Sequence, residues 1–237
     1  MNLELYYSED GDLISITPEQ ASHFAKDIAG DLNPIHDPDA RRFCVPGDFL
    51  FALVLHRFGL YQRMSFQFHR MVGRDTPILF TNDGQNKICV EDRAGKVYLE
   101  ATCDGDCTRD ALAINDFTHR YVSFSGLNFP HYLKPLMEAH GVMFNPQRPL
   151  VIYDRMDYSL DRLDVANMEL EFSGSNLLVD GKRADADLEF TMRKDGTQLG
   201  VGSKRLIISG VRPYDPAIME AVVEEFNRLK AAYQSAP

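Results

Sequence analysis

The apolar run FLFALVL, residues 49–55, is the feature that most constrains what this chain can fold into. The stretch around it, 46–62, is long enough for a helix, whereas the run itself is much shorter than the roughly 18 apolar residues that cross a membrane. Because apolar side chains occupy all sides of such a helix, most of its surface must be buried. Gly59 is its expected end, so the sequence predicts a central helix that other elements surround.

The segments that follow this helix are short, rich in β-branched and aromatic residues, and separated by Gly, Asp and Asn. Such segments are typical of strands in an antiparallel sheet. They are residues 64–71, 76–81, 87–92, 96–105 and 111–126. A buried helix followed by strands predicts an α+β fold in which the helix packs on one face of the sheet.

The same order of elements occurs a second time from about residue 125. An apolar helix is expected at 129–141, and strands are expected at 150–160, 167–179, 183–194 and 197–209. We therefore predict two units, 1–122 and 123–237, that share one continuous sheet. A single domain with one larger sheet remains the alternative.

A final helix is predicted at 215–233, with Asp215 as its N-cap. Its apolar residues recur at helical spacing and form one stripe: Ile218, Val222, Phe226, Leu229 and Tyr233. We expect this stripe to pack in the core rather than to bind a partner.

Charge and cysteine content exclude several classes of protein. The net charge of −10 argues against a nucleic-acid surface, which needs a basic patch to neutralise phosphates. The four cysteines form no CxxC pair, so reduced thiols are expected rather than a disulfide scaffold. The N-terminus lacks the basic and apolar regions of a signal peptide, so a cytoplasmic protein without membrane contact is expected.

The stretch AGDLNPIHD, residues 29–37, carries the candidate chemistry. A short helix is expected at 18–29, and Pro34 with the turn formers before it must end that helix. A turn held by Asn33 and Pro34 can bring Asp31 and His36 toward one point. A carboxylate beside an imidazole raises the basicity of the imidazole, so this pair could hold and deprotonate a water.

Phe24 followed by AGDLNPIHD resembles the hydratase signature of the MaoC-like, (R)-specific enoyl-CoA hydratase family. In that signature an aromatic and a small residue precede G-D-x-N-P-x-H, and the motif opens a hotdog-fold domain. The buried helix that follows, and FHRMVGRDT (68–76) beyond it, are also similar to that family. The repeated order of elements resembles a double hotdog, in which two units in one chain replace the usual homodimer. The resemblance therefore implies an internal pseudo-dimer and leaves a further homodimer open.

This resemblance implies a lyase of fatty acid metabolism that hydrates a 2-enoyl thioester, or dehydrates a 3-hydroxyacyl one, carried by coenzyme A or acyl carrier protein. Asp31 and His36 would bind the water, with the imidazole as its base, and the Gly47 N–H at the start of the central helix would polarise the thioester carbonyl. The expected substrate-binding residues are Asn33, Phe49, Arg41 and Arg42. No metal or other cofactor is expected, and the histidines show no ligand spacing such as HExxH.

Two departures from the family pattern keep other functions open. The family commonly has His-Gly and then an apolar residue at the start of the central helix, whereas this chain has Pro46, Gly47 and Asp48. An anionic Asp48 there would oppose an enolate unless it points to solvent or is protonated. The second unit has no copy of the motif, so at most one site per chain is implied. The alternatives are an acyl-thioesterase on the same fold and a catalytically silent protein that binds acyl thioesters or lipids.

Overall fold

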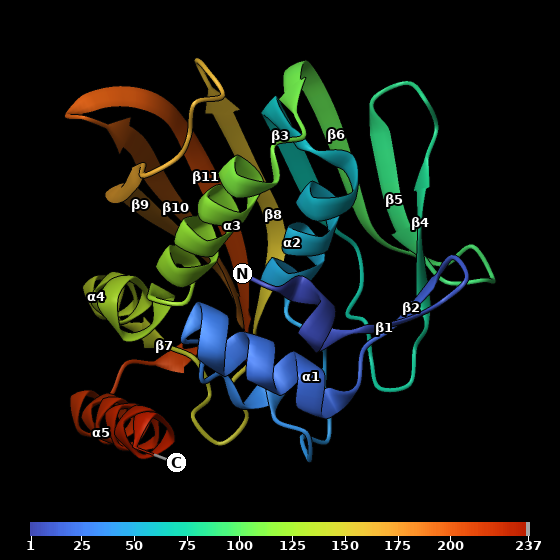
Figure 1. Ribbon diagram of the computed structural model, residues 1–237. Helices are drawn as coiled ribbons and strands as arrows, with labels where there is room; N and C mark the ends of the chain where they lie inside the picture. Colours follow the sequence, from blue (N-terminus) through green and yellow to red (C-terminus); the bar gives the residue numbers. More distant parts are fainter. Residues whose placement is uncertain (236–237) are drawn as a thin grey trace.

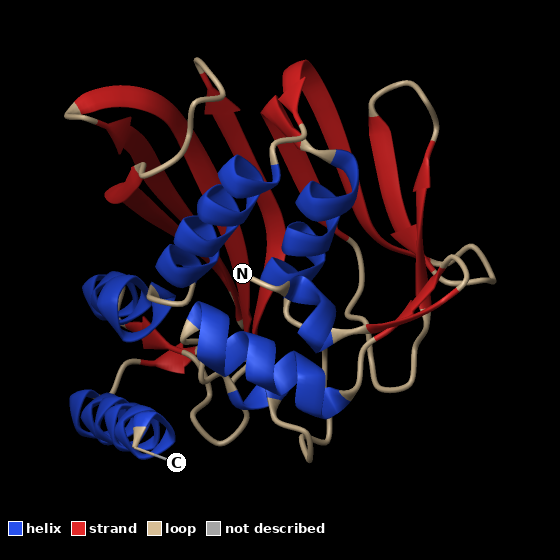
Figure 2. Cartoon of the chain, in the orientation of Figure 1, coloured by secondary structure: helices blue, strands red, loops and turns tan. Residues whose placement is uncertain are grey.

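One ten-stranded antiparallel sheet runs through the molecule, and the helices gather on one of its faces (Figures 1 and 2). The computed structural model describes residues 1–235, so the predicted C-terminal unit, 123–237, ends outside the described residues. The strand order is β1-β2-β4-β5-β6-β3-β8-β11-β10-β9. The strands are β1 (Ser8–Asp10), β2 (Leu13–Ser15), β3 (Leu60–Phe68), β4 (Ile78–Asn82), β5 (Lys87–Glu91), β6 (Val97–Thr108), β8 (Val151–Leu160), β9 (Glu169–Asp180), β10 (Arg183–Lys194) and β11 (Thr197–Ser209). A separate two-stranded ladder joins β7 (Val142–Met143) to β12 (Arg212–Pro213).

The two halves of the sheet meet where β3 pairs with β8. In Figure 1, α2 (Gly47–Phe58) lies in front of β3, and α3 (Ala111–Ser125) lies in front of the half of the sheet that β8 to β11 form. Two helix-on-sheet units thus share one continuous sheet, which is the double hotdog arrangement, and the α+β fold predicted from the sequence is confirmed. The predicted division after residue 122 falls within α3 and stays a prediction.

The central helix α2 is buried as its apolar run predicts. Every residue from Asp48 to Leu55 is buried, because α3, β3 and η2 (Phe24–Ala29) all pack on α2. The helix ends before Gly59, whose φ of +97° lies in the region that favours glycine. A Cβ at this position would lie 2.9 Å from the carbonyl oxygen of Thr108, so a side chain does not fit there.

Seven further helical segments complete the described chain, and none of the described helices is both long and apolar enough to span a membrane. They are η1 (Leu3–Tyr6), α1 (Pro18–His23), η2 (Phe24–Ala29), η3 (Pro34–His36), η4 (Asn128–Tyr132), α4 (Leu133–Ala139) and α5 (Pro216–Gln234). α1 and η2 together form the helix predicted at 18–29. Thr17 caps it through a hydrogen bond that its side chain accepts from the Gln20 N–H.

The strand predicted at 111–126 is wrong, since these residues form the helix α3. Asp110 caps the helix by accepting hydrogen bonds from the N–H groups of Leu112 and Ala113. Its buried residues follow helical spacing: Ala113, Ile114, Phe117, Thr118, Tyr121, Val122 and Ser125. The β-branched and aromatic composition predicted a strand, but the period of the buried side chains decides the structure. α3 is therefore the central helix of the second unit, and the segment 129–141 supplies only η4 and α4.

The predicted core stripe of the last helix is also corrected. Asp215 caps α5 as expected, accepting from the N–H groups of Ala217 and Ile218. Met219 is the one buried residue of α5, whereas Ile218 and Leu229 are each 40 % exposed. Four residues of the stripe line a cavity, namely Ile218, Val222, Phe226 and Leu229, whereas the Tyr233 hydroxyl donates to Asp27.

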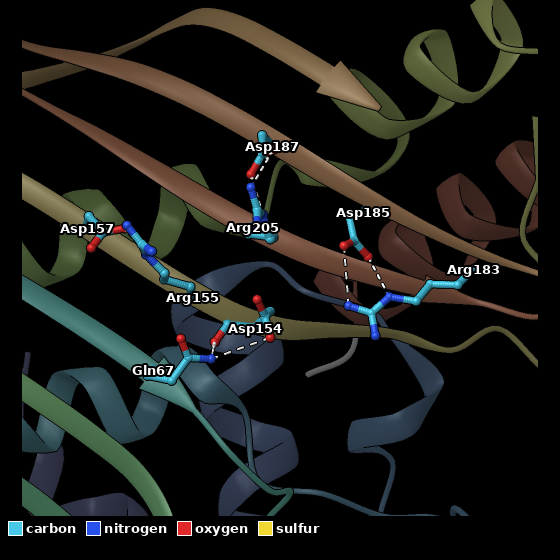
Figure 3. Close-up of polar contacts among 8 residues, drawn as sticks. All are labelled: Gln67, Asp154, Arg155, Asp157, Arg183, Asp185, Asp187 and Arg205. Atoms are coloured by element: carbon cyan, nitrogen blue, oxygen red, sulfur yellow. Dashed lines mark hydrogen bonds and ion pairs between the residues drawn. The ribbon is translucent and has the colours of Figure 1, made fainter. Parts of the chain in front are cut away.

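The face of the sheet turned away from the helices carries ion pairs (Figure 3). Nε of Arg155 lies 2.6 Å from Asp157, Nε of Arg183 lies 2.7 Å from Asp185, and Nε of Arg205 lies 2.7 Å from Asp187. On this face the Gln67 amide also donates to the Asp154 carbonyl at 2.9 Å. These acidic and basic side chains are exposed to solvent. We therefore look for a functional site that excludes water on the inner face of the sheet.

Candidate active site

The motif loop is shaped by local hydrogen bonds that depend on its particular residues. Gly30 ends η2 with a φ of +64°, which favours glycine. The Asp31 Oδ1 accepts from the Asn33 N–H at 2.8 Å, and the Asn33 Oδ1 accepts from the Ile35 N–H at 3.2 Å. Pro34 then begins η3. These successive turns use one oxygen of Asp31 and leave Oδ2 for another partner.

This second oxygen of Asp31 faces the imidazole ring of His36, as the motif predicts. The His36 side chain is buried, and its Nδ1–H donates to the Cys44 carbonyl at 2.7 Å. Its Nε2 lies 3.6 Å from the Asp31 Oδ2, too far for a direct hydrogen bond, so both atoms are free to bind one water between them. Burial alone would lower the pKa of His36, but the contacts with Cys44 and the nearby Asp31 carboxylate raise it to about 9.

A cavity of about 720 Å³ opens beside this pair. Its wall comes from the motif loop, the first turn of α2, residues 68–72, the end of α3, η4, α4, strands β8 and β11, and α5. The polar wall residues include Asp31, Asn33, His36, Asp48, Ser125, Tyr153 and Lys204, and the apolar ones include Phe129, Leu133, Val222, Phe226 and Leu229. The site thus has a polar end, built by residues of both units, and an apolar end toward α5.

The first turn of α2 reaches the cavity with unpaired N–H groups. The Pro46 carbonyl accepts from the N–H groups of Phe49 and Leu50, which leaves those of Gly47 and Asp48 without a partner in the described part of the chain. Phe68 and Tyr153 approach Gly47 so closely that a Cβ there would lie 3.1 Å from each ring. Such an N-terminus favours developing negative charge.

Asp48 is part of a buried polar cluster that the sequence does not predict. The Ser125 hydroxyl donates to the Asp48 Oδ2 at 2.5 Å, and the Lys204 ammonium donates to the Ser125 hydroxyl oxygen. Lys204 also lies over the ring of Tyr153, with Nζ 4.0 Å from the ring centroid. The Tyr153 hydroxyl is 2.6 Å from that of Tyr121. Asp48 and Lys204 therefore interact through Ser125 rather than in direct contact.

Burial changes the protonation of both charged groups in this cluster. It raises the pKa of Asp48, and the charge of Lys204 and the hydrogen bond from Ser125 offset only part of this. Burial likewise lowers the pKa of Lys204, against the attraction of Asp48 and Asp31. Asp48 does not point to solvent, as the sequence left open, and its raised pKa favours the protonated form.

Gly126 explains how the end of α3 comes so close to the motif loop. A Cβ at this position would lie 1.6 Å from the carbonyl oxygen of Ala29, two residues before Asp31. The contact requires glycine at position 126 and places Ser125 beside the loop.

The sequence does carry a signal that Lys204 is buried. In the alternating pattern of β11, Lys204 takes an inward position before buried Leu206 and Ile208.

The structure brings only some of the predicted site residues together. Asp31, Asn33, His36 and Gly47 line one cavity. Phe49 is fully buried and stacks on Phe24, with the ring centroids 4.3 Å apart. It packs in the core and is not among the residues that line the cavity.

The two predicted arginines, Arg41 and Arg42, are exposed and also lie outside the wall. Arg70 lies in the wall instead, where its guanidinium donates to the Val97 carbonyl at 2.9 Å. Among the described residues, no group of three or more His, Cys, Asp or Glu side chains is placed to hold a metal ion.

Comparison with known proteins gives one family and several similar folds. A family model described as "Protein of unknown function (DUF3581)" matches residues 1–217. A search of curated proteins finds no match.

Several solved structures are similar to the chain at low identity. A conserved protein of unknown function with hot dog fold from Alicyclobacillus acidocaldarius has a TM-score of 0.48 and 10% identity, over 90% of this chain and 99% of that one. Acyl-CoA thioesterase II TesB2 from Mycobacterium marinum has a TM-score of 0.44 and 12% identity, over 91% and 100%. A MaoC-like dehydratase has a TM-score of 0.43 and 10% identity, over 86% and 99%. The MaoC-like part of the sequence resemblance stays a prediction.

Proposed function

The chain belongs to the DUF3581 family, whose description names no activity, and from its site we propose that it adds water to, or removes water from, the acyl group of a thioester. The substrate is a 2-enoyl or 3-hydroxyacyl thioester of coenzyme A or acyl carrier protein. The observation that carries the proposal is the pair formed by half-buried Asp31 and buried His36, whose facing atoms lie 3.6 Å apart in the wall of the cavity.

The protonation of this pair assigns a role to each residue. With its raised pKa, His36 is an imidazolium at neutral pH, and Asp31 is the carboxylate beside it. In hydration the water oxygen bonds to C3 of the enoyl group, and its proton passes to Asp31. His36 gives its Nε2 proton to C2, and transfer of a proton from Asp31 to His36 then restores the pair. Here the carboxylate is the base, which differs from the assignment that the family resemblance implies.

The rest of the cavity suits the two ends of such a substrate. The N–H groups at the start of α2 can hold the thioester carbonyl, where charge develops in the reaction. The apolar side chains from η4, α4 and α5 can enclose an acyl chain. Arg70 is the one cavity-wall arginine of the described chain and is the candidate to bind a carrier phosphate.

A thioesterase is the second candidate, because the same water could attack the carbonyl carbon instead of C3. The observation in its favour is the position of Asp48, which belongs to the turn of α2 that would hold this carbonyl. Release of the free thiol distinguishes cleavage from hydration.

Turnover of a series of short to long trans-2-enoyl-CoAs tests the proposal. The assay follows loss of the conjugated thioester and release of thiol together, for the wild type, Asp31→Asn and His36→Ala. We expect loss of conjugation without thiol release, and a decrease of about 10²- to 10⁴-fold in either variant. Asp39→Asn is the matched control, because Asp39 lies in the same region but is exposed.

Each other outcome has a definite meaning. Thiol release that requires Asp31 and His36 would establish the thioesterase. Equal turnover in the wild type and Asp31→Asn would refute any role of the pair, and ligand binding without turnover would indicate a binding protein.

A further inference from the structure

The two carboxyl oxygens of Asp48 differ in their surroundings. Oδ2 accepts a hydrogen bond from Ser125, whereas Oδ1 is buried without a hydrogen-bond partner in the described part of the chain. Buried polar atoms normally have a partner, so an orphaned oxygen needs an explanation. Asp48 is a residue of the cavity wall, so a ligand that enters the cavity is the candidate for the missing partner.

The hydrogen-bond directions in the cluster locate the proton of Asp48. Lys204 donates to the oxygen of Ser125, so the serine hydroxyl gives its single hydrogen to Oδ2 of Asp48. Oδ2 is therefore an acceptor, and a proton on the carboxyl group sits on Oδ1. Burial raises the pKa of Asp48, which acts in favour of this protonated form, while the charge of Lys204 acts against it.

The position of Asp48 in α2 indicates what Oδ1 can bind. Asp48 is the second residue of the helix, next to Gly47, and the unpaired N–H groups of this turn attract an electron-rich oxygen. A carboxylate would repel such an oxygen, whereas a neutral carboxyl group donates a hydrogen bond to it. The chemical class that fits is a carbonyl that gains negative charge, such as that of a thioester.

We propose that Asp48, held by Ser125 and Lys204, donates its Oδ1 hydrogen to the carbonyl oxygen of the acyl thioester. Asp48 is then a catalytic residue, while Ser125 and Lys204 are positioning residues that fix its orientation and supply the cluster's hydrogen bonds. The inference rests on the proposed function for its choice of ligand, but carbonyl binding requires no action by Asp31 or His36.

Two unreactive ligands that differ in the carbonyl alone test this inference. In a 2-oxoalkyl-CoA a ketone replaces the thioester, and the alkyl-CoA thioether of equal length lacks the oxygen. The quantity measured by calorimetry is the ratio of their affinities, which a merely structural role of Asp48 would not change. We expect the wild type to bind the ketone about tenfold more tightly or better.

The variants separate donation from folding. Asp48→Ala should abolish the preference for the ketone, and Asp48→Asn should keep part of it, because the amide also donates. If Asp48→Ala does not fold, the double variant Asp48→Ala with Lys204→Met removes the buried lysine together with the carboxyl group and should likewise show a ratio near one. Ser125→Ala should reduce the ratio by weakening the hold on Oδ2.

The outcomes distinguish this inference from the proposed function. A wild type without preference, or a preference that survives in Asp48→Ala or the double variant, overturns the inference even if enoyl thioesters are turned over. A preference that depends on Asp48, in a protein that turns over no thioester, supports the inference and refutes the proposed activity. If neither ligand binds, both proposals fail.

Discussion

Lys204 and Arg205 are neighbours in β11 and face opposite sides of the same sheet. Arg205 is exposed and forms two hydrogen bonds to Asp187, at 2.7 and 3.0 Å (Figure 3). Lys204 is 5 % exposed and meets its acidic partner, Asp48, only through a serine. Exposed pairs contribute little to stability, whereas buried charges are costly to keep. Because burying Asp48 and Lys204 is costly, we explain these two residues by their role in the cavity rather than by a contribution to stability.

A β-bulge connects the two faces at the site. Tyr153 pairs with Leu206 and Arg155 pairs with Arg205, so Asp154 is an extra residue in β8. The bulge turns Tyr153 inward to Lys204 and sends Asp154 outward, where Gln67 binds its carbonyl (Figure 3). The hydrogen bond from Gln67 to Asp154 on the outer face therefore helps to orient Tyr153 on the inner face.

The largest expected difference between the faces is in the effect of removing an acid. Asp48→Ala leaves the Ser125 hydroxyl and the Lys204 ammonium buried without the carboxyl group of this cluster and should lower the free energy of unfolding by about 3 kcal/mol. Asp187→Ala, the matched outer change, exposes a solvated arginine and should lower it by about 1 kcal/mol at most. Urea denaturation measures both. Equal effects would remove the distinction between the faces.

The inner face should also respond to pH. The pKa of His36 is raised in the fold by Cys44 and Asp31, so this residue stabilises the protein fully below its unfolded pKa near 6.5. The stabilisation, up to about 3 kcal/mol, is lost as the pH rises through about 9. Denaturation between pH 6 and 10 should show this loss in the wild type and not in His36→Gln. A loss of the same size in the variant would mean that another group causes it.

The sequence predicts best the helices and turns whose structure depends on residues that are close together in the chain. The run 49–55 predicts α2, and the turn residues of 29–37 predict the loop that joins Asp31 to His36. In both cases the determining contacts lie close together in the chain. The prediction for 111–126 is wrong because it follows the β-branched and aromatic composition, which favours strand, rather than the helical spacing of the apolar residues.

The cluster of Asp48, Ser125 and Lys204 is not predictable from local pattern. Its members lie 77 and 79 residues apart along the chain and meet because the second unit folds against the first. The inward position of Lys204 is a signal that a lysine is buried, but its partners depend on the end of α3. Sequence reasoning therefore finds the motif half of the site and misses the half that tertiary contacts assemble.

The bulge offers a smaller and more selective test. Gln67→Leu removes the hydrogen bond to the Asp154 carbonyl and should lower the free energy of unfolding by about 1 kcal/mol. Tyr153 is then no longer held in its orientation beside Lys204. We therefore expect turnover to fall by more than the loss of stability alone explains. The matched control is Arg155→Leu, an outer-face change beside the bulge whose turnover should match the wild type. Equal turnover in both variants would show that the bulge does not position the site.

The smallest expected effect is the coupling within one outer pair. A double-mutant cycle on Arg205 and Asp187 should give about 0.2–1 kcal/mol, since water screens both side chains. That coupling should shrink as salt is raised, because the Debye length falls from about 10 Å at 0.1 M to about 3 Å at 1 M. The corresponding cycle on Lys204 and Asp48 should change much less with salt, because both groups are buried. A similar salt dependence in the two cycles would mean that water reaches the inner pair, and that Asp48 is not the neutral donor that the cavity requires.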